Sequence, residues 1–219
     1  MKVKLTKTDD RRGRSHQNTV QMRAPGTLTE GLSAVEQLKL ENEKLKAENA
    51  RLLAELHSDD LTGLFNARCL RERLKEKIDE MVADHRQPGV LFIDVDYFKS
   101  VNEVHGHQAA GKVLEQIGRL IARVIRKGDV AFRYGGDEFV VLVSGGLDGA
   151  KLVGERVRES VAQNRFLVRG LKGAAEVQVT VSVGARVMRP HDTVKSLLED
   201  ADRAMFEAKR NSRNTLVAA

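Results

Sequence analysis

Residues 133–143 read RYGGDEFVVLV, with two glycines and two acids between an aromatic residue and an apolar run. Apolar runs, VAFRY before and FVVLV after, flank its glycine pair, a pattern typical of two antiparallel strands joined by a tight turn. Asp137 and Glu138 place two adjacent acids beside that turn. Like charges so close together repel unless a cation joins them. We therefore expect a β-hairpin that presents carboxylates at one edge of a sheet, a solvated acidic turn being the alternative that the hairpin alone leaves open.

Strand and helix signals alternate on both sides of this hairpin. An apolar run predicts a buried strand over 89–96, and alternation predicts another over 176–187. Helical spacing of apolar residues predicts helices over 107–126, 148–163 and 196–209. The order β-α-β-β-α-β, after a lead-in helix, predicts an α+β fold of the polymerase-palm type. This is a split βαβ arrangement in which a central sheet contains antiparallel strands and carries helices on one face.

In such a sheet the strand that ends at Asp94 lies next to the hairpin, so Asp94, Asp137 and Glu138 are expected to converge. Carboxylates alone as ligands favour Mg²⁺ or Mn²⁺, with substrate phosphate completing the coordination. Phosphoryl transfer on a palm-like sheet uses two such ions. The residues therefore predict a magnesium- or manganese-dependent enzyme that acts on phosphate groups.

The N-terminal 58 residues carry a different pattern. Residues 1–30 hold seven Lys or Arg against three Asp or Glu, within a chain of net charge +6, and we expect a disordered basic tail. Residues 31–58 contain a heptad repeat with Leu38, Leu45 and Leu52 at position d and with Val35, Asn42, Asn49 and Leu56 at position a. This pattern predicts a helix that forms a short parallel coiled coil, and hence a homodimer. A lone amphipathic helix is the alternative.

Several classes of protein are disfavoured. A DNA-binding basic zipper needs an unbroken basic helix, whereas Pro25 and Gly26 interrupt this one, and residues 27–32 hold no Lys or Arg. No apolar run approaches 18 residues, so no membrane span is expected. The N-terminus lacks an apolar signal segment, and Cys69 is the single cysteine, which together predict a cytoplasmic location.

Five segments together resemble the GGDEF-domain diguanylate cyclases. They read DLTGLFNARCL at 60–70, DVDYFKSVNEVHGH at 94–107, RYGGDEF at 133–139, VTVSVGA at 179–185 and ADRAMFEAKRNSRN at 201–214. They follow the family's order, so residues 59–219 are expected to form one such domain. The resemblance implies that two GTP-loaded domains face each other and form cyclic di-GMP and pyrophosphate.

The resemblance also implies roles for individual residues. The implied metal ligands are the side chains of Asp94, Asp137 and Glu138 and the carbonyl of Val95. Glu138 also matches the acid that activates the attacking 3′-hydroxyl. The catalytic residues that the resemblance implies are Asp137, Glu138 and Lys99. The implied substrate contacts are Phe98 and Lys99 to the triphosphate, Asn102 and Gly111 at the guanine, Gly135 and Gly136 in the turn, and the cations Lys209 and Arg213. An RxxD site for inhibition by the cyclic di-GMP product matches Arg126 and Asp129, with Arg158 as a second arginine.

Gly111 departs from the family pattern, because it stands where an aspartate usually holds the N–H edge of guanine. Glycine neither attracts guanine nor repels adenine, so ATP becomes a possible second substrate and cyclic GMP-AMP a possible second product. The alternatives that stay open are a non-catalytic cyclic-dinucleotide receptor that retains the RxxD site and a dimeric adaptor. The intact acid pair argues against the receptor.

Overall fold

The structure of the protein is a computed structural model that describes residues 33–84, 87–171 and 173–219. The predicted basic tail over residues 1–30 lies outside the described residues. The chain divides into two units, residues 1–48 and 49–219. No helix within the described ranges combines the length and the apolar character that a membrane crossing requires.

Helix α1, Ala34–His57, confirms the helix predicted over residues 31–58. It begins with a reciprocal cap, because Ser33 N donates to Glu36 Oε2 and Glu36 N donates to Ser33 Oγ. The apolar heptad residues are at least half exposed; they are Val35, Leu38, Leu45, Leu52 and Leu56. Among the residues that the structure describes, none covers this apolar stripe of α1.

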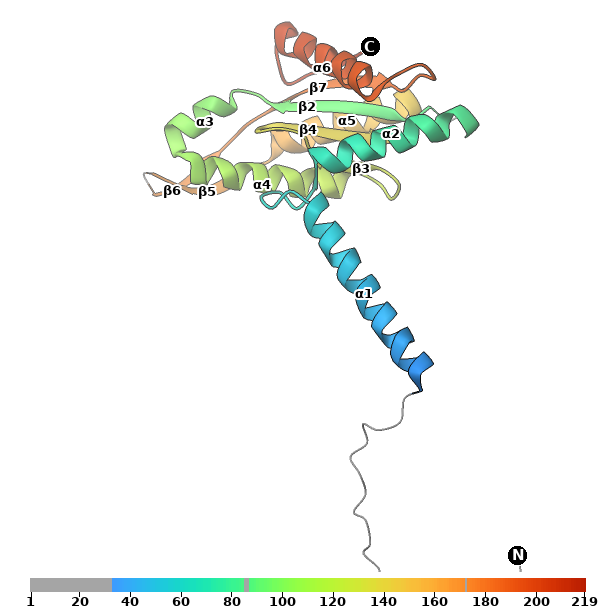
Figure 1. Ribbon diagram of the computed structural model, residues 1–219. Coiled ribbons are helices and arrows are strands. Elements are labelled where there is room, and N and C mark those ends of the chain that lie inside the picture. Colours follow the sequence, from blue (N-terminus) through green and yellow to red (C-terminus); the bar gives the residue numbers. More distant parts are fainter. Residues whose placement is uncertain (1–32, 85–86, 172) are drawn as a thin grey trace, which may run out of the picture. The chain divides into compact units, whose positions relative to one another are not determined.

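The second unit is built on a six-stranded sheet in the order β1-β3-β4-β2-β7-β8 (Figure 1). The strands are β1 Phe65–Asn66, β2 Gly89–Val95, β3 Val130–Arg133, β4 Glu138–Val143, β7 Val181–Val187 and β8 Leu216–Ala218. The three central pairings are antiparallel, whereas β1–β3 and β7–β8 are parallel. The predicted α+β architecture with a partly antiparallel central sheet is confirmed.

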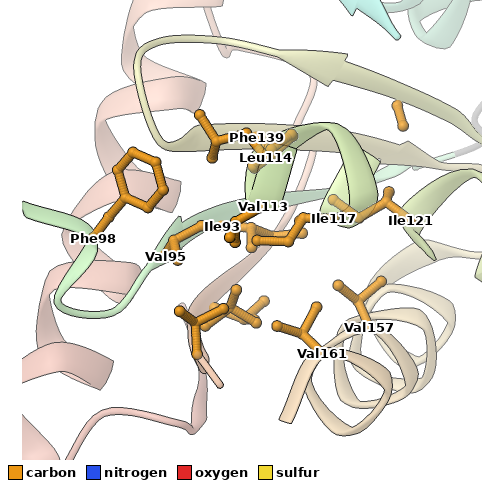
Figure 2. Packing of buried hydrophobic residues seen from close by; sticks show 14 of the residues in the cluster. Ile93, Val95, Phe98, Val113, Leu114, Ile117, Ile121, Phe139, Val157 and Val161 are labelled. Carbon is orange, nitrogen blue, oxygen red and sulfur yellow. The ribbon is translucent and has the colours of Figure 1, made fainter. Parts of the chain in front are cut away.

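Helices cover both faces of this sheet, so the prediction of helices on one face was wrong. The helices are α2 Ala67–Asp84, α3 Phe98–His105, α4 His107–Val124, α5 Gly146–Gln163 and α6 Val194–Asn211. All seven residues of β2 are buried, and its large apolar side chains from Val90 to Ile93 alternate between two apolar clusters. Leu91 and Ile93 pack with α4 and α5, as Figure 2 shows for Ile93, whereas Val90 and Phe92 pack with α2 and α6. A strand that is buried at every position has no solvent face, and this explains the second layer.

The strand predicted over 176–187 is two strands in two different sheets. Strand β6, Gly173–Val177, pairs with β5, Phe166–Gly170, in a separate hairpin, and β7 then joins the central sheet. Thr180, between them, bonds twice to Asp96 at the end of β2: its carbonyl accepts from Asp96 N, and its hydroxyl donates to Asp96 Oδ2. These bonds hold the chain where it changes sheets.

Candidate active site

The predicted acids meet where β2 ends and β4 begins. Asp94 lies directly opposite Glu138 in the antiparallel register, and the carbonyl of Asp137 accepts a hydrogen bond from Val95 N at 3.2 Å. Side chains directly opposite each other on neighbouring strands lie on the same face of the sheet. Lys209, from α6, adds a cation here, its Nζ 2.6 Å from Asp94 Oδ1. The sheet register thus gathers three acids and one cation at one edge.

The surroundings shift the pKa values of Glu138 and Asp94. Burial raises the pKa of Glu138 above its usual range, and the nearby charges of Asp94 and Asp137 raise it further. Burial also raises the pKa of Asp94, although the Lys209 ammonium opposes that shift. A carboxyl with a raised pKa holds its proton more tightly, so Glu138 is a better proton acceptor than an exposed glutamate.

The residues at this edge suit an ion that arrives with substrate phosphate. Within residues 33–84, 87–171 and 173–219, no three His, Cys, Asp or Glu side chains form a ready metal-binding cluster, so the expected three-carboxylate cluster is not preformed. Mg²⁺ commonly takes one or two carboxylates and completes its shell with phosphates and water. Asp94 Oδ1 fits that need, because it is buried and receives no well-directed hydrogen bond, only the nearby charge of Lys209.

Arg133 holds the glycine turn in place. Its Nε donates to the carbonyl of Gly135 and its Nη2 to that of Gly136, at 3.1 and 2.8 Å. Its Nη1 bonds both carboxylate oxygens of Asp59, which lies 74 residues earlier. Although burial opposes it, hydrogen bonds from Thr62 and the Arg133 charge lower the pKa of Asp59 and keep it ionised. Asp59 and Arg133 are positioning residues that sequence reasoning missed; the position of Arg133 immediately before the turn was the available signal.

A groove of about 410 Å³ runs from this turn to the start of α4, and we call it the active-site groove. It brings together many of the predicted substrate residues. Its lining consists of Leu61, Phe98, Lys99, Asn102, His107, Gly111, Leu114, Arg133, Gly136 and Asp137. Gly135 is absent from this lining, and a Cβ built on Gly135 would lie 2.2 Å from Glu138 Oε2. A side chain at position 135 would therefore displace the carboxylate of Glu138, the candidate catalytic residue.

The predicted phosphate-binding residues differ in how they are placed. The Phe98 side chain is buried in the core (Figure 2), so its backbone is the part left for a phosphate contact. Lys99 is 90% exposed, with only Glu103 nearby at 3.8 Å. Arg213 stacks over the ring of Tyr97 at 4.4 Å and donates to its hydroxyl. Lys99 thus lines the groove as an exposed cation, whereas Arg213 is held by Tyr97 and is not part of the lining.

Asp96 organises the end of β2, and sequence reasoning missed this role. Its carboxylate accepts hydrogen bonds from the hydroxyls of Thr180 and Ser182 at 2.6 and 2.7 Å, and from Asn214 N at 3.1 Å. Ser212 has a φ of 142°, a backbone conformation that favours glycine, and Asn214 has a φ of 42°. Asp96 therefore anchors the strained turn that follows α6 and carries Arg213. The available signal for this role in the sequence was the position of Asp96, two residues after Asp94.

The two residues of the predicted inhibitory site have different surroundings. The side chain of Asp129 is fully buried, and its Oδ1 accepts from the backbone and the hydroxyl of Ser144 at 3.0 and 3.1 Å. Its Oδ2 accepts from Arg126 N at 3.4 Å, while the Arg126 side chain is 62% exposed. Asp129 thus holds a loop, and Arg126 is the group that faces solvent.

Within one chain, Arg158 does not lie next to Arg126 and Asp129. Its guanidinium pairs with Glu155 and with the side chain of Asn214. Arg126 instead lies against Gly145, the residue before α5, so Arg158 is some three and a half turns further along that helix, roughly 20 Å away.

Comparison with known proteins shows the family to which the chain is similar. The family model described as "Diguanylate cyclase, GGDEF domain" matches residues 56–215. Diguanylate cyclase TpbB from Pseudomonas aeruginosa is 35% identical over 78% of this chain and 39% of its own length. Response regulator PleD from Caulobacter vibrioides is 33% identical over 73% of this chain and 35% of its own. The chain thus spans well under half the length of these curated relatives.

Solved structures show the same fold. Diguanylate cyclase SiaD from Pseudomonas aeruginosa, in complex with its activator SiaC, gives a TM-score of 0.74 at 33% identity, covering 84% of this chain and 72% of that one. The coiled coil and GGDEF domain of DgcB from Caulobacter crescentus, in complex with c-di-GMP, gives 0.75 at 25% identity, covering 84% and 97%. Because the family model matches residues 56–215, most of the chain, this protein belongs to the GGDEF-domain family of diguanylate cyclases.

Proposed function

We propose that this chain is a diguanylate cyclase that joins two molecules of GTP into cyclic di-GMP and releases two molecules of pyrophosphate. One observation carries the proposal: Asp94 lies opposite Glu138 across the β2–β4 pairing, and the adjacent Asp137 lines a groove that also holds an amide, Asn102, suited to a base. The names of the relatives support the same chemistry. A non-catalytic receptor or a dimeric adaptor would not need the complete set of acids beside Lys209.

The residues divide the work of each of the two bond-forming steps. The 3′-hydroxyl oxygen of one GTP attacks the α-phosphorus of the other, the bond from that phosphorus to pyrophosphate breaks, and the hydroxyl proton passes to Glu138. The raised pKa of Glu138 suits it to accept that proton. Asp94 and Asp137 would hold Mg²⁺ or Mn²⁺, which would neutralise phosphate charge and make the hydroxyl more acidic. Lys99 and Lys209 offset the charge that develops on the phosphates.

Turnover needs two chains, because each groove binds one of the two nucleotides. We place the assembly in α1, whose apolar heptad residues are exposed in the single chain. The resemblance to a structure that consists of a coiled coil and a GGDEF domain supports this assignment. Asn42 and Asn49 at core positions of the heptad favour one register at a cost in stability.

Gly111 supports a second product. It lines the groove beside Asn102, whose amide nitrogen donates weakly to Phe98 O at 3.4 Å and whose oxygen lies 3.1 Å from His107 Nδ1. A carboxylate here would accept from guanine N1–H and N2–H and would repel the bare N1 of adenine. Without it, discrimination between the bases falls. We assign cyclic GMP-AMP as the product formed when ATP accompanies GTP.

The product assay tests both statements at once. Purified protein with Mg²⁺ and equal GTP and ATP is expected to form cyclic di-GMP together with cyclic GMP-AMP, resolved by mass spectrometry. Gly111→Asp should raise the ratio of cyclic di-GMP to cyclic GMP-AMP by at least about tenfold, because it restores a hydrogen-bonding carboxylate. The same ratio in both proteins would remove Gly111 from base selection, and no cyclic dinucleotide at all would contradict the enzymatic function.

Product inhibition is expected to depend on Arg126 rather than on both RxxD residues equally. An exposed guanidinium can pair with guanine O6 and N7, so Arg126→Ala should weaken cyclic di-GMP binding by about 1–3 kcal/mol without changing thermal stability. Asp129→Asn should instead lower the melting temperature, because a buried carboxylate that accepts from Ser144 is altered. Calorimetric titration and thermal denaturation measure the two effects. Equal product affinity in the native protein and in Arg126→Ala would show that this arginine takes no part in inhibition.

A further inference from the structure

A second cavity adjoins the active-site groove at Gly111. This cavity, which we call the hairpin cleft, has a volume of about 1010 Å³ and lies between the start of α4 and the β5–β6 hairpin. Leu61, His107 and Gly111 line both cavities. A Cβ built on Gly111 would meet nothing nearer than Leu61 Cδ1, at 3.7 Å. The space above Gly111 is therefore open, and a side chain there would stand between the groove and the cleft.

The orientation of a nucleotide in the groove follows from its two ends. Among the lining residues, Asp137 and Lys99 suit phosphates and a metal ion, whereas Asn102, which contacts His107 one turn before Gly111 on α4, suits a base. A purine is attached to its ribose through N9, so the edge that carries N1 and the exocyclic groups is the part farthest from the sugar. A nucleotide bound with its phosphates at Asp137 therefore directs that edge toward Gly111.

The hairpin cleft offers a cationic and apolar lining. Lys112 and Arg169 contribute the charges, and Leu61 and Leu171 contribute apolar surface. The ten residues that line the cleft, all of them among those the structure describes, include no Asp or Glu. The Lys112 ammonium bonds Glu115 at 2.5 Å on its own helix, so Arg169 is the stronger candidate for meeting a ligand.

We propose that the base end of the groove opens through Gly111 into the hairpin cleft, so that this chain binds purine nucleoside triphosphates that carry a substituent on N2 of guanine or N6 of adenine. The substituent lies in the cleft, and an anionic tail on it is preferred over a cationic one because Arg169 and Lys112 face it. The proposal rests on the proposed function, since it requires a nucleotide in the active-site groove. It goes beyond base choice, because it concerns what can be attached to the base.

Equilibrium binding to the full chain tests this with three probes: GTP, N2-(4-carboxybutyl)-GTP and N2-(4-aminobutyl)-GTP. The native protein is expected to bind the carboxylate probe within about fivefold of GTP, and about fivefold more tightly than the amine probe at low salt. Gly111→Leu should weaken both substituted probes at least about tenfold relative to GTP, because the leucine fills the opening. Gly111→Ala, which keeps the helix with the smallest added group, should give a smaller loss in the same direction.

Two variants on the hairpin separate charge from shape. Arg169→Gln is expected to abolish the preference for the carboxylate tail. Arg165→Gln, which removes an arginine that pairs with Glu176 and does not line the cleft, should keep the preference. If GTP binds but both substituted probes bind more than about 100-fold more weakly, or if Gly111→Leu leaves their affinity relative to GTP unchanged, the proposal is wrong. Failure of GTP itself to bind would instead overturn the proposed function together with it.

Discussion

Glu138→Gln is expected to slow cyclic dinucleotide formation by about 100- to 10,000-fold, the range that a positioned general base contributes. Glutamine keeps the size of the side chain but cannot accept the proton of the attacking hydroxyl. Glu138 lies opposite Asp94 across the β2–β4 pairing, so the substitution changes the acid edge and leaves the sheet pairing intact. Initial rates of pyrophosphate release, with circular dichroism as the check on folding, measure the effect.

The pH dependence of the rate gives an independent test of the same residue. Burial and the charges of Asp94 and Asp137 raise the pKa of Glu138, and only its deprotonated form accepts a proton. The rate should therefore fall as the pH drops through this raised pKa, at a higher pH than for an ordinary glutamate. The residual activity of Glu138→Gln should lack that limb of the profile.

A matched substitution controls for the loss of one negative charge. Glu76→Gln changes an exposed glutamate on α2 that pairs only with Arg73, and it is expected to retain both the rate and the pH limb. Turnover of Glu138→Gln within threefold of the native protein would contradict the assignment of Glu138 as the proton acceptor.

Disrupting the heptad stripe of α1 is expected to make turnover depend steeply on protein concentration. The substitution Leu45→Lys places a charge at heptad position d and should dissociate the dimer. In the dimer, each domain meets its partner domain at an effective concentration near the millimolar range. A monomeric variant at micromolar concentration should therefore lose roughly 100- to 1,000-fold in specific activity. Light scattering and rates over a range of protein concentrations measure the two effects together.

Leu40→Lys is the matched control for this substitution. Leu40 is 50% exposed and Leu45 is 59% exposed, but Leu40 falls at heptad position f, outside the predicted seam. Leu40→Lys should remain dimeric with unchanged activity. A Leu45→Lys protein that is dimeric and fully active would show that α1 is not the assembly device, and dissociation by both variants would point to another surface of the helix.

Local patterns in the sequence located several of the elements and indicated the chemistry of the acids. Alternation and helical spacing are local properties, read within a few residues, and they located the β3–β4 hairpin, α4, α5 and α6 to within a few residues. The acid pair after the glycines predicted the edge where Asp94 and Glu138 meet, because pairing in a split βαβ sheet places those strands side by side. Neither inference required a contact between distant segments other than strand pairing.

The tertiary structure decided which partners each of these residues has. The Arg133 guanidinium bonds Asp59 across 74 residues, Lys209 reaches Asp94 from α6, and the hairpin that carries Arg169 closes a cleft beside Gly111. Burial in a sheet that is covered on both faces raises the pKa of Glu138. Hydrogen bonds from Ser144 give Asp129 a structural role. Periodicity reports only which face of an element is apolar, whereas these contacts arise when faces from distant segments pack together. That packing set the charge, the shape and the open end of the groove.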